Sequence, residues 1–337
     1  MLGVEASPAK SRTLLAGLGS SVDSGEDAFR ASGLLAPAER KRLENVNLQA
    51  FEHAWQQGVR ILTETSYPQV LLEAEEHVLP ALFVHGALDC LSYPTVGIVG
   101  TRAASAYGKA CAQKFAEALA SAGVTVVSGG ALGIDAAAHR GALAVGGSTI
   151  AVLAGGVDHI YPAVHAALFR QIRTRGCLVS QYAIGAKPNE YKFLARNTLI
   201  AALSRALLVV QAPTRSGALS TAHAAAELGR EVFVVPANID SIEFRGSFNL
   251  IRDGATLVYH PDQVLEAIGV ERKEAEPAPE SSEIGTRILA VLGNSPLDAE
   301  RIVDRTGLNA GEVLAELTML ELDGLVIRET SGYMRKL

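Results

Sequence analysis

The chain has 337 residues, a net charge of -6, 48% hydrophobic and 5% aromatic residues, and three cysteines. This length suits about two or three domains, and the scarcity of aromatics favours a helix-covered parallel sheet over a β-sandwich. Three cysteines without a CxxC pair argue against a disulfide framework and give no zinc signature. The chain shows no signal-peptide features and no 18-residue apolar run free of charges or breakers, so we expect a soluble, cytoplasmic protein without membrane contact.

The charge is distributed unevenly along the chain. Residues 1–94 carry 7 Lys+Arg and 12 Asp+Glu (net -5), residues 95–260 carry 15 and 9 (net +6), and residues 261–337 carry 8 and 15 (net -7). Salt screens charges beyond about 8 to 10 Å, so local charge governs which partner binds. The middle segment is therefore compatible with a nucleic-acid partner, although an excess of six charges could also arise by chance.

Residues 1–58 are predicted to form a small helical domain of the SAM or helix-hairpin-helix type. Apolar residues recur there at helical spacing, and glycines interrupt them. The turn Leu18–Ser20 could mimic a helix-hairpin-helix phosphate contact, but the negative charge of the segment favours a scaffolding role. Two short strands, Arg60–Leu62 and Leu82–Gly86, are expected to lead into the main sheet.

Residues 59–270 predict a domain of the α/β class with a mostly parallel sheet. Apolar strand candidates alternate with helical stretches, which implies crossover connections between parallel strands. Strands are expected at Val96–Val99, Val124–Val127, Thr149–Leu153, Leu178–Ser180, Leu207–Gln211, Val232–Val235 and Thr256–Val258. Helices are expected at Tyr107–Ala122, Ile134–Ala144, His165–Arg175 and Ala218–Leu228, with another beginning near Asn197.

Residues 271–283 read as a linker, because none of them is an apolar residue larger than alanine or proline. Residues 284–337 then predict a winged-helix domain, with three amphipathic helices followed by a hairpin. Its third helix, Ala310–Leu322, stands where most such domains read DNA, but its acidic side chains would repel phosphate. A protein-contact or regulatory role is therefore favoured for this domain.

Glycine-bearing turns follow several of the predicted strands. Helix N-termini at the carboxyl ends of parallel strands present unpaired N–H groups to anions, so these turns predict a phosphate-binding rim. In the first turn, the Thr101 hydroxyl and backbone N–H groups are expected to meet an anion, and Arg102 to add a bidentate phosphate contact. Each glycine could instead merely relieve a tight turn. The turns are Gly97–Arg102, Ser128–Asp135, Ala154–Asp158 and Ser216–Thr221.

A basic and aromatic cluster is expected in the connection that follows Ser180. Rings stack on unpaired bases while cations follow the backbone, so such a cluster predicts binding of single-stranded nucleic acid. Phe193 could equally belong to the core. The cluster comprises Lys187, Tyr191, Lys192, Phe193 and Arg196.

No catalytic residue, cofactor or metal is expected. The first turn is not GxGxxG, and no acidic residue follows the second strand to hold a ribose, which disfavours a nicotinamide cofactor. The histidines His139, His159 and His223 lack metal-ligand spacing and are expected to be structural or solvated. Helix capping accounts for Asp135 and Asp158.

Taken together, these motifs resemble the DNA-processing protein family, DprA or Smf. The resemblance covers nearly the whole chain in ordered blocks, among them Val99–Arg102, Ile160–Pro162, Ser216–Leu219 and Asn249–Ile251. It implies a non-catalytic protein that binds incoming single-stranded DNA in a basic pocket, protects it, and helps load RecA during natural transformation and recombination. It also implies an extended Rossmann-like domain over residues 59–270 and a homodimer.

By position and motif, thirteen residues are assigned to DNA binding. They are Gly100, Thr101, Arg102, Ser128, Gly129, Gly130, Lys187, Lys192, Phe193, Arg196, Asn197, Ser216 and Gly217. The chain departs from the usual family pattern at Gln181 and Gln211, where the family has acids, at Thr198, where it has arginine, and at Ala237, where it has glycine. Losing the acids should favour a polyanion, and losing the arginine should weaken one phosphate contact.

Two alternatives stay open. The fold also resembles nucleotide phosphoribohydrolases of the lysine-decarboxylase-like family, which carry a glutamate shortly after a Pro-Gly-Gly-x-Gly-Thr turn. Here Ser216–Thr221 is followed by Ala222 and His223, so no general acid or base stands at that position, and Glu227 is two helical turns along. A mononucleotide-sensing regulator would use the same pocket, but its affinity would not rise with strand length.

Overall fold

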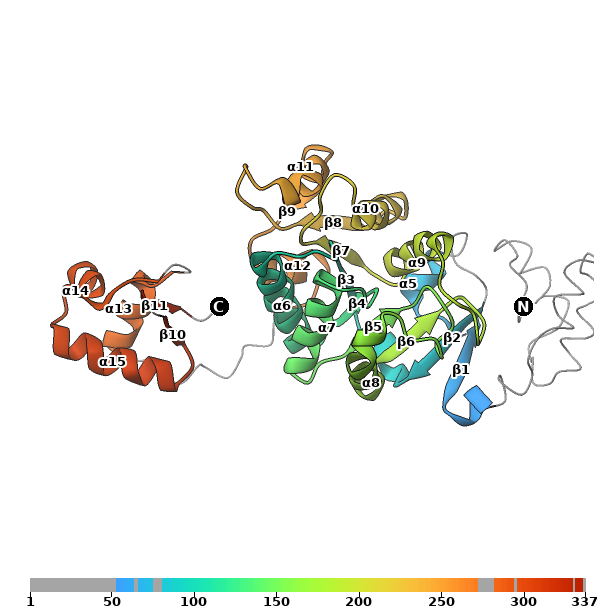
Figure 1. Cartoon of the computed structure of the whole chain (residues 1–337), viewed down its shortest axis with the longest axis horizontal. Helices are drawn as coiled ribbons and strands as arrows, with labels where there is room; N and C mark the ends of the chain where they lie inside the picture. The colour runs from blue at the N-terminus through green and yellow to red at the C-terminus, as the bar shows by residue number, and fades with distance from the viewer. Residues whose placement is uncertain are drawn as a thin grey trace, which may run out of the picture. The chain divides into compact units, whose positions relative to one another are not determined.

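The computed structural model describes residues 53–63, 66–74, 81–271, 282–293, 296–329 and 331–335. Most of the helical domain expected over residues 1–58 lies outside these residues, as does most of the expected linker. The chain divides into two compact units, residues 1–271 and 272–337 (Figure 1). Each unit is described by itself.

The described part of the first unit is built on one sheet, in the order β1-β2-β6-β5-β4-β3-β7-β8-β9 (Figure 1). All neighbours from β6 to β9 pair in parallel, whereas β1 pairs antiparallel with β2, and β2 antiparallel with β6. The expected Rossmann-like, mostly parallel sheet is thus confirmed. The strands are β1 (Val59–Thr63), β2 (Ala81–Gly86), β3 (Thr95–Val99), β4 (Thr125–Ser128), β5 (Thr149–Val152), β6 (Cys177–Ser180), β7 (Ala206–Val209), β8 (Glu231–Val234) and β9 (Thr256–Leu257).

The strand order creates a switch point between β3 and β7. From β3 the chain adds β4, β5 and β6 on one side, and it then returns so that β7 pairs with the other side of β3. Ligands of open α/β sheets bind outside the carboxyl ends of the strands at such a point. The segments that follow β3 and β7 therefore border the expected crevice.

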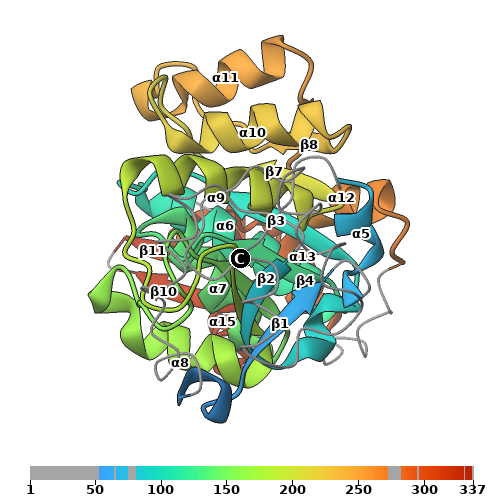
Figure 2. The same ribbon diagram turned by 90° about the vertical axis from the view of Figure 1, so that its right-hand side faces the viewer.

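Helices cover both faces of the sheet, and successive strand residues point to opposite layers. In β3, Val96 and Ile98 pack with the layer that contains α6 and α7, whereas Val99 packs with the layer that contains α9 and α10. Figure 2 shows α10 and α11 together along one border of this unit. The helices are α5 (Gln69–Leu72), α6 (Ala106–Ser121), α7 (Ile134–Ala144), α8 (Ala166–Arg175), α9 (Glu190–Ala202), α10 (Gly217–Glu227), α11 (Arg245–Arg252) and α12 (Pro261–Ala267).

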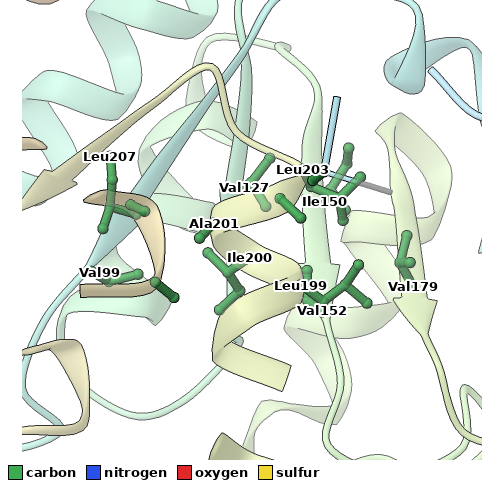
Figure 3. Close-up of a cluster of buried hydrophobic side chains, with 14 of the residues drawn as sticks. Val99, Val127, Ile150, Val152, Val179, Leu199, Ile200, Ala201, Leu203 and Leu207 are labelled. Carbon is green, nitrogen blue, oxygen red and sulfur yellow. The ribbon is translucent and has the colours of Figure 1, made fainter. Parts of the chain in front are cut away.

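Helix α9 is anchored on the centre of the sheet. Figure 3 shows Leu199 and Ile200 of α9 in one apolar cluster with strand side chains such as Val127 and Val152. Leu199 and Ile200 are 2% and 1% exposed, and burying an aliphatic side chain of this size contributes about 1.5 to 3 kcal/mol. The carboxyl-terminal half of α9 thus fixes where its amino-terminal half lies.

The start of α9 corrects one expectation. The helix begins at Glu190 rather than near Asn197, because the Asn189 side chain caps it by accepting a hydrogen bond from the Lys192 N–H at 2.9 Å. The basic and aromatic cluster is therefore mostly helical and does not lie in an irregular connection. The first turns of α9 carry charged and aromatic side chains in place of an apolar stripe, which conceals their helical periodicity.

The described part of the second unit consists of α13 (Glu283–Val291), α14 (Ala299–Thr306), α15 (Ala310–Leu322) and the antiparallel hairpin of β10 (Val326–Glu329) and β11 (Gly332–Arg335). It has an apolar core of its own, which includes Ile288, Ile302 and Leu317. The expected winged helix is confirmed. Helix α15 contains no lysine or arginine, and it exposes Leu314, Met319 and Leu322.

Candidate nucleic-acid interface

The turn after β3 is fixed by backbone hydrogen bonds to both of its neighbours. The Thr101 N–H donates to the Gln211 carbonyl at 2.8 Å, and the Thr101 carbonyl accepts from the Ile134 N–H at 3.2 Å. The Thr101 hydroxyl accepts from the Ala103 N–H at 3.3 Å. The Thr101 amide is therefore paired within the protein, and contact of the Thr101 hydroxyl and the other N–H groups of this turn with an anion stays a prediction.

Gln211, two residues after the end of β7, holds this turn through its side chain. Its side chain is fully buried, and Oε1 accepts from the Ser105 N–H at 3.0 Å and from the Ser105 hydroxyl at 2.9 Å. Ser105 in turn caps α6. A neutral amide at this position leaves the rim without the acidic charge that the usual family glutamate would bring.

The turn after β4 is satisfied internally. The buried Ser128 hydroxyl donates to the Ile98 carbonyl at 2.6 Å. The N–H groups of Gly129 and Ala131 donate to Asp135 Oδ2 at 3.1 and 3.3 Å. Asp135 thus holds this turn. It does not cap α7, because the N-cap residue of that helix is Gly133, and no side chain caps the helix. The capping expectation was wrong for Asp135.

Arg196 joins the carboxyl ends of β4 and β5. Its side chain is buried, and Nη1 donates to the carbonyls of Gly129 and Val152 at 2.6 and 2.7 Å. A Cβ at Gly129 would lie 2.5 Å from Arg196 Nη1 and 2.7 Å from Asp135 Oδ2, so this position requires glycine. The pKa of Arg196 is lowered, mainly by burial. The charge of Asp135 raises this pKa, and the charge of Arg102 lowers it further.

Phe193 lies between two guanidinium groups. Arg102 is 5.0 Å and Arg196 is 5.6 Å from the centre of its ring, and the Tyr161 ring meets it edge-on at 5.8 Å. Arg102 and Tyr161 are exposed, whereas Phe193 is partly buried. We call Arg102, Tyr161, Phe193 and Arg196 the arginine–aromatic cluster. Its outer side offers a cation and two rings to a ligand.

Two lysines extend the basic surface from this cluster. The Lys192 ammonium donates to the Lys187 carbonyl at 3.0 Å and lies 5.0 Å from the centre of the Tyr182 ring. Lys192 is 9% exposed, whereas Lys187 is exposed to solvent. Lys187 is therefore placed for a ligand contact, and Lys192 for positioning the loop.

The start of α10 borders the same crevice. The Asn197 side-chain amide donates to the Ser220 hydroxyl at 2.9 Å and to the Gly217 carbonyl at 3.2 Å, which ties α9 to α10. Ser216 caps α10 by accepting from the Ala218 N–H at 3.3 Å. A Cβ at Gly217 would meet only Asn197 Nδ2, at 3.9 Å. A ligand could therefore come close to the backbone here.

The thirteen predicted residues are Ser128 at the end of β4, residues of the segments that follow β3, β4 and β7, and residues of the approach and first turns of α9. These residues fall into three groups by the exposure of their side chains and backbone to solvent. Arg102, Lys187 and Gly217 are exposed; Gly100, Thr101, Phe193, Asn197 and Ser216 are partly exposed; Ser128, Gly129, Gly130, Lys192 and Arg196 are buried. Direct DNA contact by each residue stays a prediction, and the buried ones are better suited to positioning their neighbours.

Sequence reasoning did not assign Tyr161 or Tyr182 to the site, although each ring contacts one of its residues. The Tyr161–Pro162 dipeptide was part of the family pattern, which is the signal that could have led to Tyr161. Tyr182 contacts Lys192 across a gap of ten residues, and no local pattern reveals this.

The site offers little for hydrolysis or for metal binding. Glu227 is the last residue of α10, about 15 Å from the start of the helix at 1.5 Å per residue, which does not favour the phosphoribohydrolase alternative. Among the described residues, no group of three His, Cys, Asp or Glu side chains could hold a metal ion. No helix within the described ranges has the length and apolarity needed to span a membrane.

Two family models match the chain over most of its length. The family described as DNA recombination-mediator protein A matches residues 58–269, and the DprA winged helix domain matches residues 272–332. The chain belongs to the DprA family. Among its DprA relatives, Protein Smf of Synechocystis is 37% identical over 328 residues, covering 85% of this chain and 82% of the relative.

Two solved DprA structures resemble the chain. DNA processing protein A of Streptococcus pneumoniae has a TM-score of 0.65 at 34% identity, over 77% of this chain and 91% of that one. The Helicobacter pylori DNA processing protein A, whose structure concerns its single-stranded DNA binding mode, has a TM-score of 0.56 at 30% identity, over 62% of this chain and 95% of that one.

Proposed function

We propose that this chain is a cytoplasmic, non-catalytic protein that binds single-stranded DNA at the switch point between β3 and β7. The arginine–aromatic cluster is the observation that carries this proposal. It combines an exposed guanidinium with two aromatic rings at the sheet edge where such folds bind ligands. From its membership of the DprA family, we infer that the protein acts in natural transformation and recombination, where it would protect incoming DNA and help load RecA.

In this proposal each part of the site has one task. Arg102 contacts phosphate, because its guanidinium is exposed and can donate two parallel hydrogen bonds. Tyr161 and Phe193 offer rings to unpaired bases, and Lys187 follows the backbone. Arg102 contributes to lowering the pKa of Arg196, so the two cations repel each other. A phosphate beside them would relieve this repulsion.

We also propose that the chain acts as a homodimer, which places two such sites on one strand. Large apolar side chains are exposed on the two segments that follow β8 and β9. After β8, Ile239 is 95% exposed and Ile242 64%; after β9, Tyr259 is 72% exposed. β9 is an edge strand of the described sheet, and both of its residues are exposed. A second copy of the chain is the occupant that we infer for this surface.

For the winged helix we propose a protein-contact role in place of DNA reading. Its third helix, α15, carries Glu312, Glu316 and Glu321 and no cation, which disfavours contact with phosphate.

The decisive experiment is fluorescence anisotropy of labelled thymidine oligomers of increasing length, at about 50 and 200 mM salt, with duplex DNA as competitor. The wild-type chain should bind more tightly with length and more weakly at higher salt. Arg102→Ala should lower the affinity by about tenfold or more, equal to about 1.4 kcal/mol or more. The fold should remain intact, because Arg102 is exposed.

Arg140→Ala is the matched control, since Arg140 is an exposed arginine of α7 outside the site. It should bind the oligomers like the wild type. Oligomer binding that does not change with salt, or equal losses in the two variants, would contradict the proposal. Binding of mononucleotides without a gain from strand length would favour the regulator alternative.

A further inference from the structure

A cavity lies beside α8, and none of the four residues of the arginine–aromatic cluster lines it. It has a volume of about 420 Å³, within the range of about 300 to 1,000 Å³ in which proteins bind small ligands. Its wall is formed by residues 53–59, the end of β2, the loops after β5 and β6, and α8. None of the thirteen predicted site residues lines it.

The cationic side of this cavity comes from α8. Arg170 and Arg173 both line it, and neither forms an ion pair with the described carboxylates. Asp158 is the one acidic residue among the lining residues, and both of its oxygens accept from the Gly185 N–H, at 3.0 and 2.9 Å. The cavity therefore has an excess of positive charge.

His85 holds Arg173 in place. Arg173 Nη1 lies 3.2 Å from His85 Nε2, and a guanidinium can only donate, so the imidazole accepts and is neutral. Burial, followed by the charge of Arg173, lowers the pKa of His85, and a hydrogen bond with the Gln57 backbone opposes this. Arg173 is thus oriented by a neutral partner that leaves its charge uncompensated.

Apolar side chains also line the cavity, and we call them its apolar wall. Val157, Ile160, Ile184 and Phe169 contribute to the lining, and the amide of Gln57 adds a group that can both donate and accept hydrogen bonds. A ligand that fits needs an anionic end for the arginines, a flat apolar part, and polar atoms at its edge.

We propose that the α8 cavity binds a nucleoside monophosphate group, with its phosphate against Arg170 and Arg173 and its base against the apolar wall. This group could belong to a free nucleotide or to the phosphorylated end of a DNA strand. The second source rests on the proposed DNA-binding function, whereas the first does not.

The test uses the full chain and isothermal titration calorimetry with dTMP, thymidine and inorganic phosphate. Wild type should bind dTMP at least about tenfold more tightly than either fragment, because only dTMP meets both walls. Arg173→Gln should weaken dTMP binding by about tenfold or more, the loss of a charge-assisted contact. Arg175→Gln, an exposed arginine of the same helix that does not line the cavity, should bind like wild type.

Further measurements identify whether the nucleoside monophosphate group comes from a free nucleotide or a strand end, and they separate the cavity proposal from the DNA-binding proposal. An oligomer with a 5′-phosphate that binds more tightly than its 5′-hydroxyl form, with the difference lost in Arg173→Gln, would assign the site to strand ends. Binding of dTMP without that difference would assign it to free nucleotide. The affinity of the wild type for dTMP and the difference from Arg173→Gln test the cavity, whereas binding of the 5′-hydroxyl oligomer tests the DNA-binding proposal, so failure of either proposal can be recognised independently.

Absence of dTMP binding by the wild type, or thymidine binding as tight as dTMP binding, would overturn the proposal. Equal dTMP affinity of wild type and Arg173→Gln would also overturn it. Should circular dichroism show that Arg173→Gln is not folded, Arg170→Gln replaces it, because Arg170 is exposed and lines the same wall.

Discussion

Arg102 and Arg196 contact the same phenylalanine ring, yet their surroundings differ completely. Arg102 is exposed, whereas Arg196 is buried and donates from Nη1 to two backbone carbonyls. The exposed residue can reach a ligand, and the buried one supports the turn after β4 and the end of β5. Loss of binding in variants of these two residues would therefore have different causes.

Arg196→Met should destabilise the fold rather than only weaken DNA binding. The change leaves the carbonyls of Gly129 and Val152 without their donor and removes the cation nearest the buried Asp135. Breaking a buried charged interaction of this kind typically costs about 3 to 5 kcal/mol. Denaturant unfolding of Arg196→Met and Arg102→Ala checks this: the first should lose much of its stability and the second little. Equal stability of both variants would refute a supporting role for Arg196.

His139 makes the stability of the fold sensitive to acid. Thr149 donates its hydroxyl to the Val126 carbonyl at 2.7 Å, so His139 Nδ1 is the donor to Thr149 Oγ1, at 2.7 Å. Burial is the largest cause that lowers the pKa of His139 to about 3. Between about pH 6.5 and 3 the unfolded chain takes up a proton that the folded chain does not.

We therefore expect the free energy of unfolding to be highest above pH 6.5 and to fall as pH is lowered, by about 1 kcal/mol per pH unit from His139. The lowered pKa of His85 acts in the same direction, whereas the raised pKa of Asp135 opposes it. Urea unfolding from pH 7 to 4.5 provides the measurement. His139→Asn should give a shallower slope, and slopes that coincide would count against this explanation.

At the scale of elements, the first turns of α9 link folding to the proposed binding. Asn189→Ala removes the cap that accepts from the Lys192 N–H, which typically costs about 1 kcal/mol. The carboxyl-terminal half stays anchored in the core, so we expect faster amide exchange near Lys192 and Phe193 and weaker oligomer binding. Hydrogen exchange and anisotropy would measure the two effects.

Ser282→Ala is the matched control for this change. Ser282 caps α13 by accepting from the Gly285 N–H at 2.9 Å, in the second unit. Its loss should cost similar stability in that unit and leave oligomer binding unchanged. If Asn189→Ala exchanged and bound like the wild type, the start of α9 would not be a critical part of the site.

The strands and crossover helices could be predicted from the sequence because their apolar residues have clear periods. The predicted helix Ile134–Ala144 coincides with α7, and strand boundaries differ by one or two residues. The start of α9 could not be predicted in this way, because its first turns carry charged and aromatic side chains and no apolar stripe. The pairing of donors in the turns was also missed, since Gln211 and Asp135 reach those turns through contacts in space.

At the scale of the whole molecule, the homodimer proposal can be tested on one side chain. Ile242→Asp should convert the chain to a monomer by size-exclusion chromatography with light scattering, because it places a charge on a surface that we expect to be buried between copies. Oligomer affinity should fall as the second site is lost. The control is Val145→Asp, at an exposed apolar residue after α7. A monomeric wild type, or a dimeric Ile242→Asp, would rule out this surface.

The contact between Gln211 and the turn after β3 spans a long stretch of chain. The two hydrogen bonds from Ser105 to Gln211 Oε1 join residues 106 positions apart. During synthesis, the ribosome therefore makes Arg102 long before the strand that fixes its turn has emerged. The proposed DNA site would therefore be complete only once β7 is in place, and under this proposal a prematurely terminated product ending before β7 would not compete with the finished protein for DNA strands.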